Sequence, residues 1–351
     1  ALKYNLTIKN IDTIMHTFFP EYSGLSGSVV SGNLNTTTQK FSLDANIASI
    51  GYNEFHFKNL AIVGAGDYTG LDLNATCDNF LYKEEVIIPS FQINAQMAND
   101  TASLSIVTQS INDILGDAYL NLKAVALNNY LYVSILPSSV RIKEDTWQLH
   151  GRDDLVFGKE ITISDLIMES GAQKIVVNTK KSTSNDLTLS VNELDLQSFS
   201  SYANQTNPSF SGRISGEIDV NNFLDNPVVK ASIFSTNEVL IDNDTLGFVS
   251  ANVTFDTKNE FIGIGNNTHI IRHNNKAEVS GSVNVKSNSI NVKTSLDRTD
   301  ISFLNQFVRD YVTDMNGSAT GVVNIKGTLD KPDISGNIVI SNASIKVTYL
   351  G

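Results

Sequence analysis

The chain has 351 residues, of which 41% are hydrophobic and 18% charged, and its formal net charge is −12. This apolar fraction is too high for a disordered chain, and the acidic balance argues against nucleic acid, which needs a basic face. No stretch approaches the roughly 18 consecutive apolar residues of a transmembrane helix, and the single cysteine, Cys77, excludes an internal disulfide framework. One cysteine in such a length fits an oxidising compartment such as a periplasm.

Both ends of the chain look like cuts within a longer protein. It begins Ala1-Leu2-Lys3-Tyr4, with no initiator Met and no apolar signal segment, and stops at Gly351 directly after a strand-like run. We therefore expect a segment whose targeting and anchoring signals lie outside it.

The first expected element is a short helix from Ile11 to Phe19, stopped by Pro20. Beyond it, apolar and polar residues alternate with period two, as in half-buried β-strands, for example at Phe41–Ala45 and Leu104–Ile106. The run Gly64–Gly70 is similar to a dinucleotide-binding loop, but it is followed by a strand pattern and not by a helix. A hairpin turn is expected there.

The middle of the chain continues this pattern between two further short helices. Helices are expected at Ser110–Leu115, stopped by Gly116, and at Asp195–Ala203. Between them, Asp186–Leu196 alternates strictly, and clusters of Asn, Ser, Gly and Asp separate such runs at intervals of roughly 8–12 residues.

An internal repeat covers the second half of the chain. A Gly-x-x-x-Gly frame at Gly212 and Gly216 runs on to Leu224-Asp225-Asn226-Pro227. The same frame returns 317 − 212 = 105 residues later, at Gly317 and Gly321, and runs on to Leu329-Asp330-Lys331-Pro332. A looser copy opens the chain with Gly24, Gly27 and Gly32. Such a repeat indicates an extended, repetitive β architecture.

Two motifs with the spacing of a metal site fall within this repeat. His269-x-x-x-His273 has the spacing of a helical metal pair but lies in a strand and turn. Asp242–Gly247 offers the first, third and sixth positions of a calcium loop, but Val253 stands where the bidentate Glu belongs. We therefore predict a strand and turn at the first place and a turn at the second, with no metal, no cofactor and no enzyme active site.

Alternation returns before the C-terminus, at Val283–Lys286 and Ile290–Lys293. The clearest helix pattern spans Asp300 to Met315, with Gly317 after its end. Few and short helices cannot cover the apolar faces of so many strands. The predicted fold is mainly β, an elongated, curved β-sheet trough with a few short amphipathic helices. Its repeat-like sub-units would be residues 1–116, 117–210, 211–315 and 316–351, the last one truncated.

In-phase apolar residues predict which side chains line the trough, because a one-residue slip would turn each of them outward. The candidate lining residues are Leu187, Leu189, Val191, Ile214, Ile218, Val220, Val283, Val285, Ile290, Val292, Val323, Ile325, Ile338 and Ile340.

Two groups of residues carry a family resemblance. The first comprises Thr146–His150, Ile161–Leu166, Gly171–Ile175, Leu187–Leu189 and Leu194–Leu196, and the second comprises Ile301–Met315 and the frame Gly317–Gly336. In this order they resemble the TamB (translocation and assembly module subunit) and AsmA-like family, most densely from residue 140 to 351. The Asn-rich, Lys-containing composition is similar to that of a Bacteroidota member.

The resemblance implies a β-taco fold with an apolar groove, in a periplasmic protein anchored in the inner membrane of a Gram-negative bacterium. It also implies two partners: a phospholipid or other acyl-chain ligand, and an outer-membrane barrel of the Omp85 type. This segment is expected to stop before the portion that approaches the barrel, so that the barrel contact lies outside it.

The function predicted on this basis is a bridge-like protein that carries phospholipid between the inner and outer membranes and supports outer-membrane assembly. The alternative is a structural or adhesive β-repeat module whose core is filled by its own side chains. The residues leave open the lipid species, the direction and energy source of transport, and whether residues 1–140 share the groove.

Overall fold

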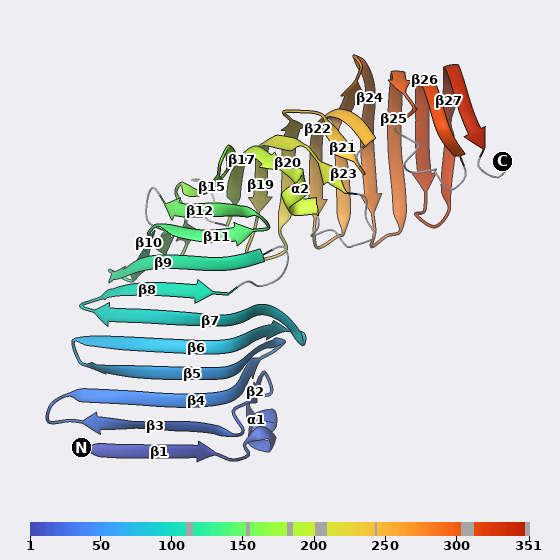
Figure 1. The fold of residues 1–351 in the computed structure, drawn as a ribbon. Coiled ribbons are helices and arrows are strands. Elements are labelled where there is room, and N and C mark those ends of the chain that lie inside the picture. The colour runs from blue at the N-terminus through green and yellow to red at the C-terminus, as the bar shows by residue number, and fades with distance from the viewer. Residues whose placement is uncertain are drawn as a thin grey trace. The chain divides into compact units, whose positions relative to one another are not determined.

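The structure is a computed structural model that describes residues 1–109, 115–151, 155–180, 185–200, 209–242, 244–302 and 312–347. It is 75% strand and 4% helical, and it forms an open antiparallel sheet (Figure 1). The predicted class, mainly β with few short helices, is confirmed. The chain divides into unit 1, residues 1–170, and unit 2, residues 171–351, and each unit is described by itself. The four predicted sub-units stay a prediction.

The described part of unit 1 contains one helix and fifteen strands. They are β1 (Leu2–Ile8), α1 (Asp12–Phe18), β2 (Tyr22–Gly24), β3 (Ser28–Asn35), β4 (Lys40–Tyr52), β5 (Phe55–Asp67), β6 (Gly70–Tyr82), β7 (Glu85–Ala98), β8 (Thr101–Thr108), β9 (Leu115–Leu127), β10 (Tyr130–Ile135), β11 (Ser138–Ile142), β12 (Asp145–Gly151), β13 (Leu155–Phe157), β14 (Ile161–Thr162) and β15 (Leu166–Ser170).

Long antiparallel hairpins build the first part of unit 1. β1 pairs with β3, and from β3 to β9 each strand pairs with the next along the chain. The turns between them are tight because their residues accept a left-handed backbone. At Asn99-Asp100 and Asn128-Asn129, both central residues have φ between 48° and 64°, as the favoured two-residue hairpin turns require. Gly64–Gly70 spans the β5–β6 hairpin, as predicted.

Beyond β9, pairs of short strands take the place of single long strands. β10 pairs with one half of β9, and β11 pairs with the other. Pro137 separates them, because it has no N–H to continue the ladder. The Ser138 hydroxyl accepts a hydrogen bond from the Asn121 N–H at 2.8 Å instead. β12 and β13, and then β14 and β15, continue the two halves.

A line of interrupted pairs bends the sheet of unit 1. The regular register breaks at Ala48, Asn59, Asp78 and Ser90, which lie side by side on β4 to β7. Asn59 and Ser90 have left-handed φ values of 52° and 35°, so each locally turns its strand. Figure 1 shows these strands curving near the end that lies beside α1 and β2.

In the described residues of unit 2 there are one helix and twelve strands. They are β16 (Gln173–Thr179), β17 (Leu187–Asp195), α2 (Leu196–Ser200), β18 (Phe210–Ser211), β19 (Arg213–Asn221), β20 (Val228–Ser235), β21 (Val239–Ile241), β22 (Asp244–Asp256), β23 (Phe261–Arg272), β24 (Asn275–Asn284), β25 (Ser289–Asp300), β26 (Val312–Gly327) and β27 (Pro332–Val347).

The sheet of unit 2 is again antiparallel, in the order β16-β17-β19-β20-β22-β23-β24-β25-β26-β27. The repeat found in the sequence has a physical cause here. Gly216 and Gly321, which hold equivalent places in the two copies, have φ of 147° and 148°. An added Cβ would lie 2.2 Å from the Ser232 carbonyl oxygen at Gly216, and 2.0 Å from that of Asn337 at Gly321. Only glycine fits at either place.

Two of the four predicted helices are present, at least in part, in the described residues. α1 confirms the first, and α2 confirms Leu196–Ser200 of the third. The other two predicted helices overlap strands, because Leu115 begins β9, Asp300 ends β25 and Val312–Met315 belong to β26. Residues 110–114 and 303–311 of these predictions lie outside the described residues.

Little of either unit forms a buried core. Within the described residues, Trp147, Cys77 and Ser28 are the largest side chains that are less than 2% exposed. Otherwise the buried apolar residues are mostly small, such as Ala45, Ala75 and Ala95. A single layer of sheet leaves its larger aliphatic side chains half-buried.

Candidate functional site

The sheet of unit 1 has one face built entirely from uncharged, mostly apolar residues. Pairing in register places them in three adjacent rows across β4 to β9. The rows are Phe41-Gly66-Leu71-Met97-Ala102-Ala124, Leu43-Gly64-Leu73-Ala95-Leu104-Leu122 and Ala45-Ile62-Ala75-Ile93-Ile106-Leu120. Because residues two apart on a strand point to the same side, the three rows form one continuous surface, the apolar face of unit 1.

Burial on the apolar face follows side-chain size. Ala45 and Ala95 are each only 4% exposed, since larger neighbours cover them. The leucines and isoleucines of the rows, Leu73 and Leu104 among them, are half-buried. Together, these half-buried side chains expose a contiguous apolar area that is much larger than that of isolated exposed residues.

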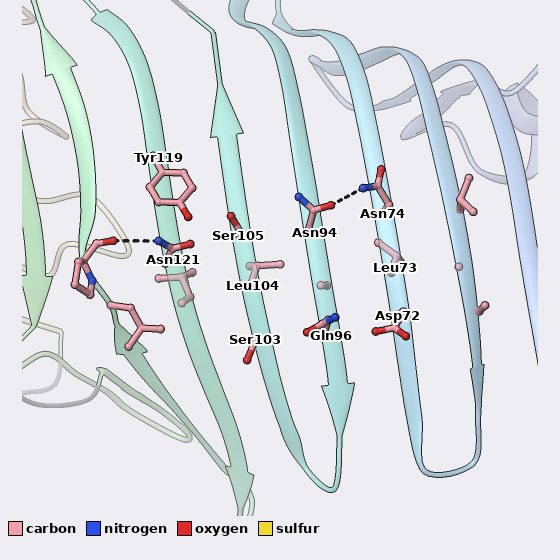
Figure 2. A pocket seen from close by; sticks show the side chains of 17 residues that line it. Asp72, Leu73, Asn74, Asn94, Gln96, Ser103, Leu104, Ser105, Tyr119 and Asn121 are labelled. Atoms are coloured by element: carbon pink, nitrogen blue, oxygen red, sulfur yellow. Dashed lines mark hydrogen bonds between the residues drawn. The ribbon is translucent and has the colours of Figure 1, made fainter.

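The opposite face of the same strands is mixed, because polar side chains stand there beside Val63, Ala65 and Tyr119. A hollow of about 820 Å³ lies on it, over β5 to β9, and its polar lining includes Asp72, Asn74, Asn94, Gln96 and Asn121 (Figure 2). These residues alternate with the row of Leu73 and Leu104, so their side chains project to the other side.

Side-chain amides link the strands across this hollow. The Asn74 amide donates to the Asn94 side-chain oxygen, which also accepts from Gln92 at 3.3 Å. The Asn121 amide donates to the Pro137 carbonyl oxygen at 3.1 Å. An acyl chain laid here would remove water from these polar groups, at a cost of about 1–3 kcal/mol for each group left without a partner. The apolar face carries no such cost.

Across the bend, the apolar face of unit 1 continues as a group of rings. We define the aromatic cluster as Tyr22, Tyr52, Phe55, Phe57, Phe80, Tyr82 and Phe91. Phe91 joins it to the aliphatic rows, because it lies two residues before Ile93 on β7 and its ring centroid is 6.3 Å from that of Phe57. The ring centroids of Phe57 and Phe80 are 4.7 Å apart, and those of Phe55 and Tyr82 are 5.0 Å apart.

Thirteen of the fourteen lining residues predicted from the sequence lie in strands of unit 2. Leu187 and Leu189 pair with Val220 and Ile218, and Val292 pairs with Ile325. These pairs belong to two uncharged rows, Leu187-Val220-Val229-Phe255-Ile262-Val283-Ile290 and Leu189-Ile218-Ala231-Val253-Ile264-Gly281-Val292-Ile325-Ile334. We call this surface the apolar face of unit 2.

The remaining predicted residues, apart from Val285, lie in the same sheet but outside these two rows. Val191 and Ile214 lie beside the second row, on β17 and β19, separated by an irregularity in register. Val323 pairs with Gly336, while Ile338 and Ile340 pair with Gly321 and Ala319.

Val285 is the exception. β24 ends at Asn284, so Val285 stands in the turn to β25 and is 54% exposed. The strand expected over Val283–Lys286 is therefore too long. Ser287 and Asn288 complete the turn, in which the Asn284 side chain accepts from the Ser287 N–H at 2.7 Å.

The sequence did not single out the apolar face of unit 1 or the aromatic cluster. The alternations at Phe41–Ala45 and Leu104–Ile106 were the available signal for the former. Phe55 and Phe57, and Phe80 and Tyr82, also keep period two, but the interrupted pairs at Asn59 and Asp78 shift their alternation by one residue relative to the aliphatic rows.

The motifs with metal-site spacing form turns and strands. His269 lies in β23, where its Nδ1 is 2.9 Å from the Asn267 carbonyl oxygen, and His273 follows that strand, 3.5 Å from Asp300. Within the described ranges, no group of three or more His, Cys, Asp or Glu side chains could hold a metal ion. No helix in the described part of the chain is long and apolar enough to cross a membrane.

An open antiparallel sheet with an apolar and a mixed face defines a class of β proteins that offer an apolar surface to a ligand. Residues 266–351 of this chain match the family model described as the TamB C-terminal domain. This match confirms the TamB resemblance over residues 266–351. Residues 266–351 are therefore similar to the C-terminal domain of the family. The expectation that the barrel contact lies outside this segment stays a prediction. Neither the curated proteins nor the solved structures contain a match to it.

Proposed function

We propose that the apolar faces of the two units form a path along which phospholipid acyl chains pass between the inner and outer membranes. The observation that carries this proposal is the unbroken register of uncharged residues in both units. An acyl chain lying there exchanges water for apolar contact, which contributes about 0.8 kcal/mol for each buried CH₂ group.

Transport along such a face is passive. The rows repeat similar aliphatic side chains at every strand, so no position binds an acyl chain much more tightly than the next. Small residues such as Ala75, Ala95 and Gly281 alternate with larger ones and leave shallow depressions. Head groups remain in water beside the polar edges, because desolvating a charged phosphate is costly.

TamB-family proteins belong to the Gram-negative envelope and are transport and assembly proteins, not enzymes. We extend this to the present chain and propose that it works in the periplasm, as part of a protein anchored in the inner membrane. Its partner in the outer membrane would be an Omp85-type barrel, whose assembly role it supports. The match to the C-terminal domain at residues 266–351 supports this placement.

A matched pair of substitutions in each unit tests the path. Leu104→Asp and Val292→Asp place a carboxylate on an apolar face, while Ser105→Asp and Asn291→Asp place it on the opposite face of the same strands. Because Leu104 and Val292 are half-buried, water reaches the new charge and the protein stays folded. Organic extraction of purified protein followed by mass spectrometry measures the bound phospholipid.

We expect phospholipid to co-purify with the wild type and with the two controls, and to be lost from Leu104→Asp and Val292→Asp. Cells that depend on the protein should lose outer-membrane integrity with the same two variants. Large losses of stability in these variants, with no lipid in the wild type, would instead support the structural or adhesive module with a filled core. Normal stability with normal lipid content would exclude the path.

A further inference from the structure

The outer end of the aromatic cluster carries four rings that are exposed to an unusual degree. Tyr22 is 41% exposed, Tyr52 51%, Phe55 42% and Tyr82 37%. They stand where β2 begins and where the β4–β5 and β6–β7 hairpins turn. Exposed aromatic residues gathered in one patch mark a binding surface more often than isolated ones do.

Each of these segments places carboxylates next to its rings. Glu21 precedes Tyr22, Glu54 precedes Phe55, and Glu84 and Glu85 follow closely after Tyr82. Backbone hydrogen bonds hold the segments together: the Asn53 N–H donates to the Glu21 carbonyl at 2.6 Å, and the Lys83 N–H to that of Glu54 at 3.0 Å. Four acidic residues and one lysine thus lie next to the four rings along the chain, in segments that backbone hydrogen bonds hold together.

Lys83 shows how an ammonium group sits in this surface. Its Nζ lies 5.2 Å from the centre of the Tyr82 ring and 3.4 Å from the Glu54 carboxylate. The Tyr82 hydroxyl and the Glu54 charge both raise the pKa of Lys83. The chain's own ammonium therefore occupies a place that an aromatic face and a carboxylate make favourable to cations.

We infer that this surface recognises the ammonium head group of a zwitterionic phospholipid, of the phosphatidylethanolamine class, while the acyl chains lie on the adjoining apolar face. The inference rests on the proposed lipid path and adds a preference to it. A cation gains from the ring faces and from the carboxylates, whereas an anionic head group meets an excess of negative charge. Because Phe91 joins the rings to the aliphatic rows, head group and chains can be bound together.

The test compares two phospholipids with identical acyl chains, phosphatidylethanolamine and phosphatidylglycerol, offered in equimolar vesicles to the purified, delipidated protein. The bound ratio is read by extraction and mass spectrometry. From the size of a cation–π contact we expect the wild type to prefer phosphatidylethanolamine by about fivefold or more.

Three variants separate the contributions to this preference. Tyr82→Leu keeps an apolar side chain but removes the ring face, and the combined Glu54→Gln, Glu84→Gln and Glu85→Gln variant removes the charges. Both should bring the ratio close to one with total bound lipid unchanged. Phe234→Ala removes a ring that is 52% exposed in unit 2, outside the cluster, and should leave the ratio as in the wild type.

Lys83→Ala gives the most direct result, because it vacates the place that the lipid ammonium would take. We expect it to increase the preference for phosphatidylethanolamine. A fall in phosphatidylglycerol and phosphatidylethanolamine binding alike would show that Lys83 binds the phosphate, which would overturn the inference. Equal binding of the two lipids by the wild type would overturn it while leaving the path intact, and absence of any bound lipid would refute the path itself.

Discussion

The two units share one architecture but differ in the side chains of their apolar faces. Each is a single antiparallel layer with an uncharged face, but the described ring–ring contacts all lie in unit 1. The apolar face of unit 2 relies on Val, Ile and Leu, with Phe255 the ring within its two rows. An aliphatic face suits any acyl chain, whereas clustered rings add an electrostatic preference. If the proposed function holds, both units would conduct acyl chains and unit 1 would add the head-group preference inferred above.

What the units share is the way their strands are bent. Where the regular pairing breaks, a buried hydroxyl takes the place of a backbone partner. In unit 1 the Ser28 hydroxyl accepts from the Ala48 N–H and the Thr108 hydroxyl from the Ala118 N–H at 3.0 Å. In unit 2, Ser235 accepts from the Val249 N–H at 2.8 Å. The buried Ser215 hydroxyl likewise accepts from the Glu193 N–H, and the half-buried Thr268 and exposed Thr320 hydroxyls accept from Asn252 and Arg298.

The largest difference expected between the units is in their cores. Trp147 is 0% exposed in unit 1, while the buried apolar residues of unit 2 are smaller, Val191 at 6% among them. Trp147→Ala should lower the free energy of unfolding by about 3–5 kcal/mol, and Val191→Ala by about 1–2 kcal/mol. Urea unfolding followed by circular dichroism measures both.

The single tryptophan also reports which unit unfolds, since Trp147 fluorescence senses unit 1 alone. Val191→Ala should shift the circular dichroism transition more than the fluorescence transition. Equal shifts by both probes would show that the two units unfold as one cooperative body.

Removal of a buried hydroxyl should lower the free energy of unfolding by a similar amount in both units, because each hydroxyl accepts a hydrogen bond from one backbone N–H. Ser28→Ala and Ser235→Ala leave the N–H groups of Ala48 and Val249 unpaired, and each should lose about 1–3 kcal/mol of stability. Ser103→Ala, exposed on the mixed face, serves as the control and should stay within about 0.5 kcal/mol. A neutral result at Ser28 or Ser235 would mean that water replaces the hydroxyl.

Much of this fold is predictable from alternation alone. Leu187–Val191 of β17 and Ile290–Leu296 of β25 keep strict period two, so which of these residues share a face follows directly from the sequence. The repeat was equally visible, because a glycine that must admit a neighbouring carbonyl tolerates no substitute, as at Gly216 and Gly321.

The bends were not predictable, and they caused the errors. A polar residue at an interrupted pair, such as Asn59 or Arg298, looks like any solvated strand position, yet its left-handed φ reorients the strand. The rings of the aromatic cluster therefore could not be placed on the same side as Ile93. The prediction for Val285 was wrong for a related reason. An apolar residue in a tight turn continues the alternation in the sequence although the strand has already ended.

The ion pairs provide a smaller contrast between the units. In unit 2, Asp300 lies 3.5 Å from both Arg272 and His273, and its side chain is 23% exposed. Burial alone would raise the pKa of Asp300, but hydrogen bonds from Ser302 and the charges of Arg272 and His273 together hold the pKa below its usual value of 3.8.

A lowered pKa in the folded state means that stability is present above the unfolded value and is lost as pH falls through the folded one. Asp300→Asn should therefore flatten the loss of stability on acidification below about pH 4. Thermal melts of both proteins between neutral pH and pH 2.5 measure this. An unchanged pH profile in the variant would show that other carboxylates, such as Asp219, dominate acid unfolding.

The smallest effect is expected at the shortest of these pairs. In unit 1, Arg141 donates to Asp117 at 2.8 Å, closer than any contact of Asp300, and the pair lowers the pKa of Asp117 through this hydrogen bond first. The side chains are 41% and 66% exposed, however, so water and salt screen the attraction, and ordering two mobile side chains offsets the rest. Asp117→Asn should leave the melting temperature unchanged within error at physiological ionic strength. A drop matching that of Asp300→Asn at neutral pH would show that the distance between the charges, and not their exposure, sets the strength of an ion pair on these sheets.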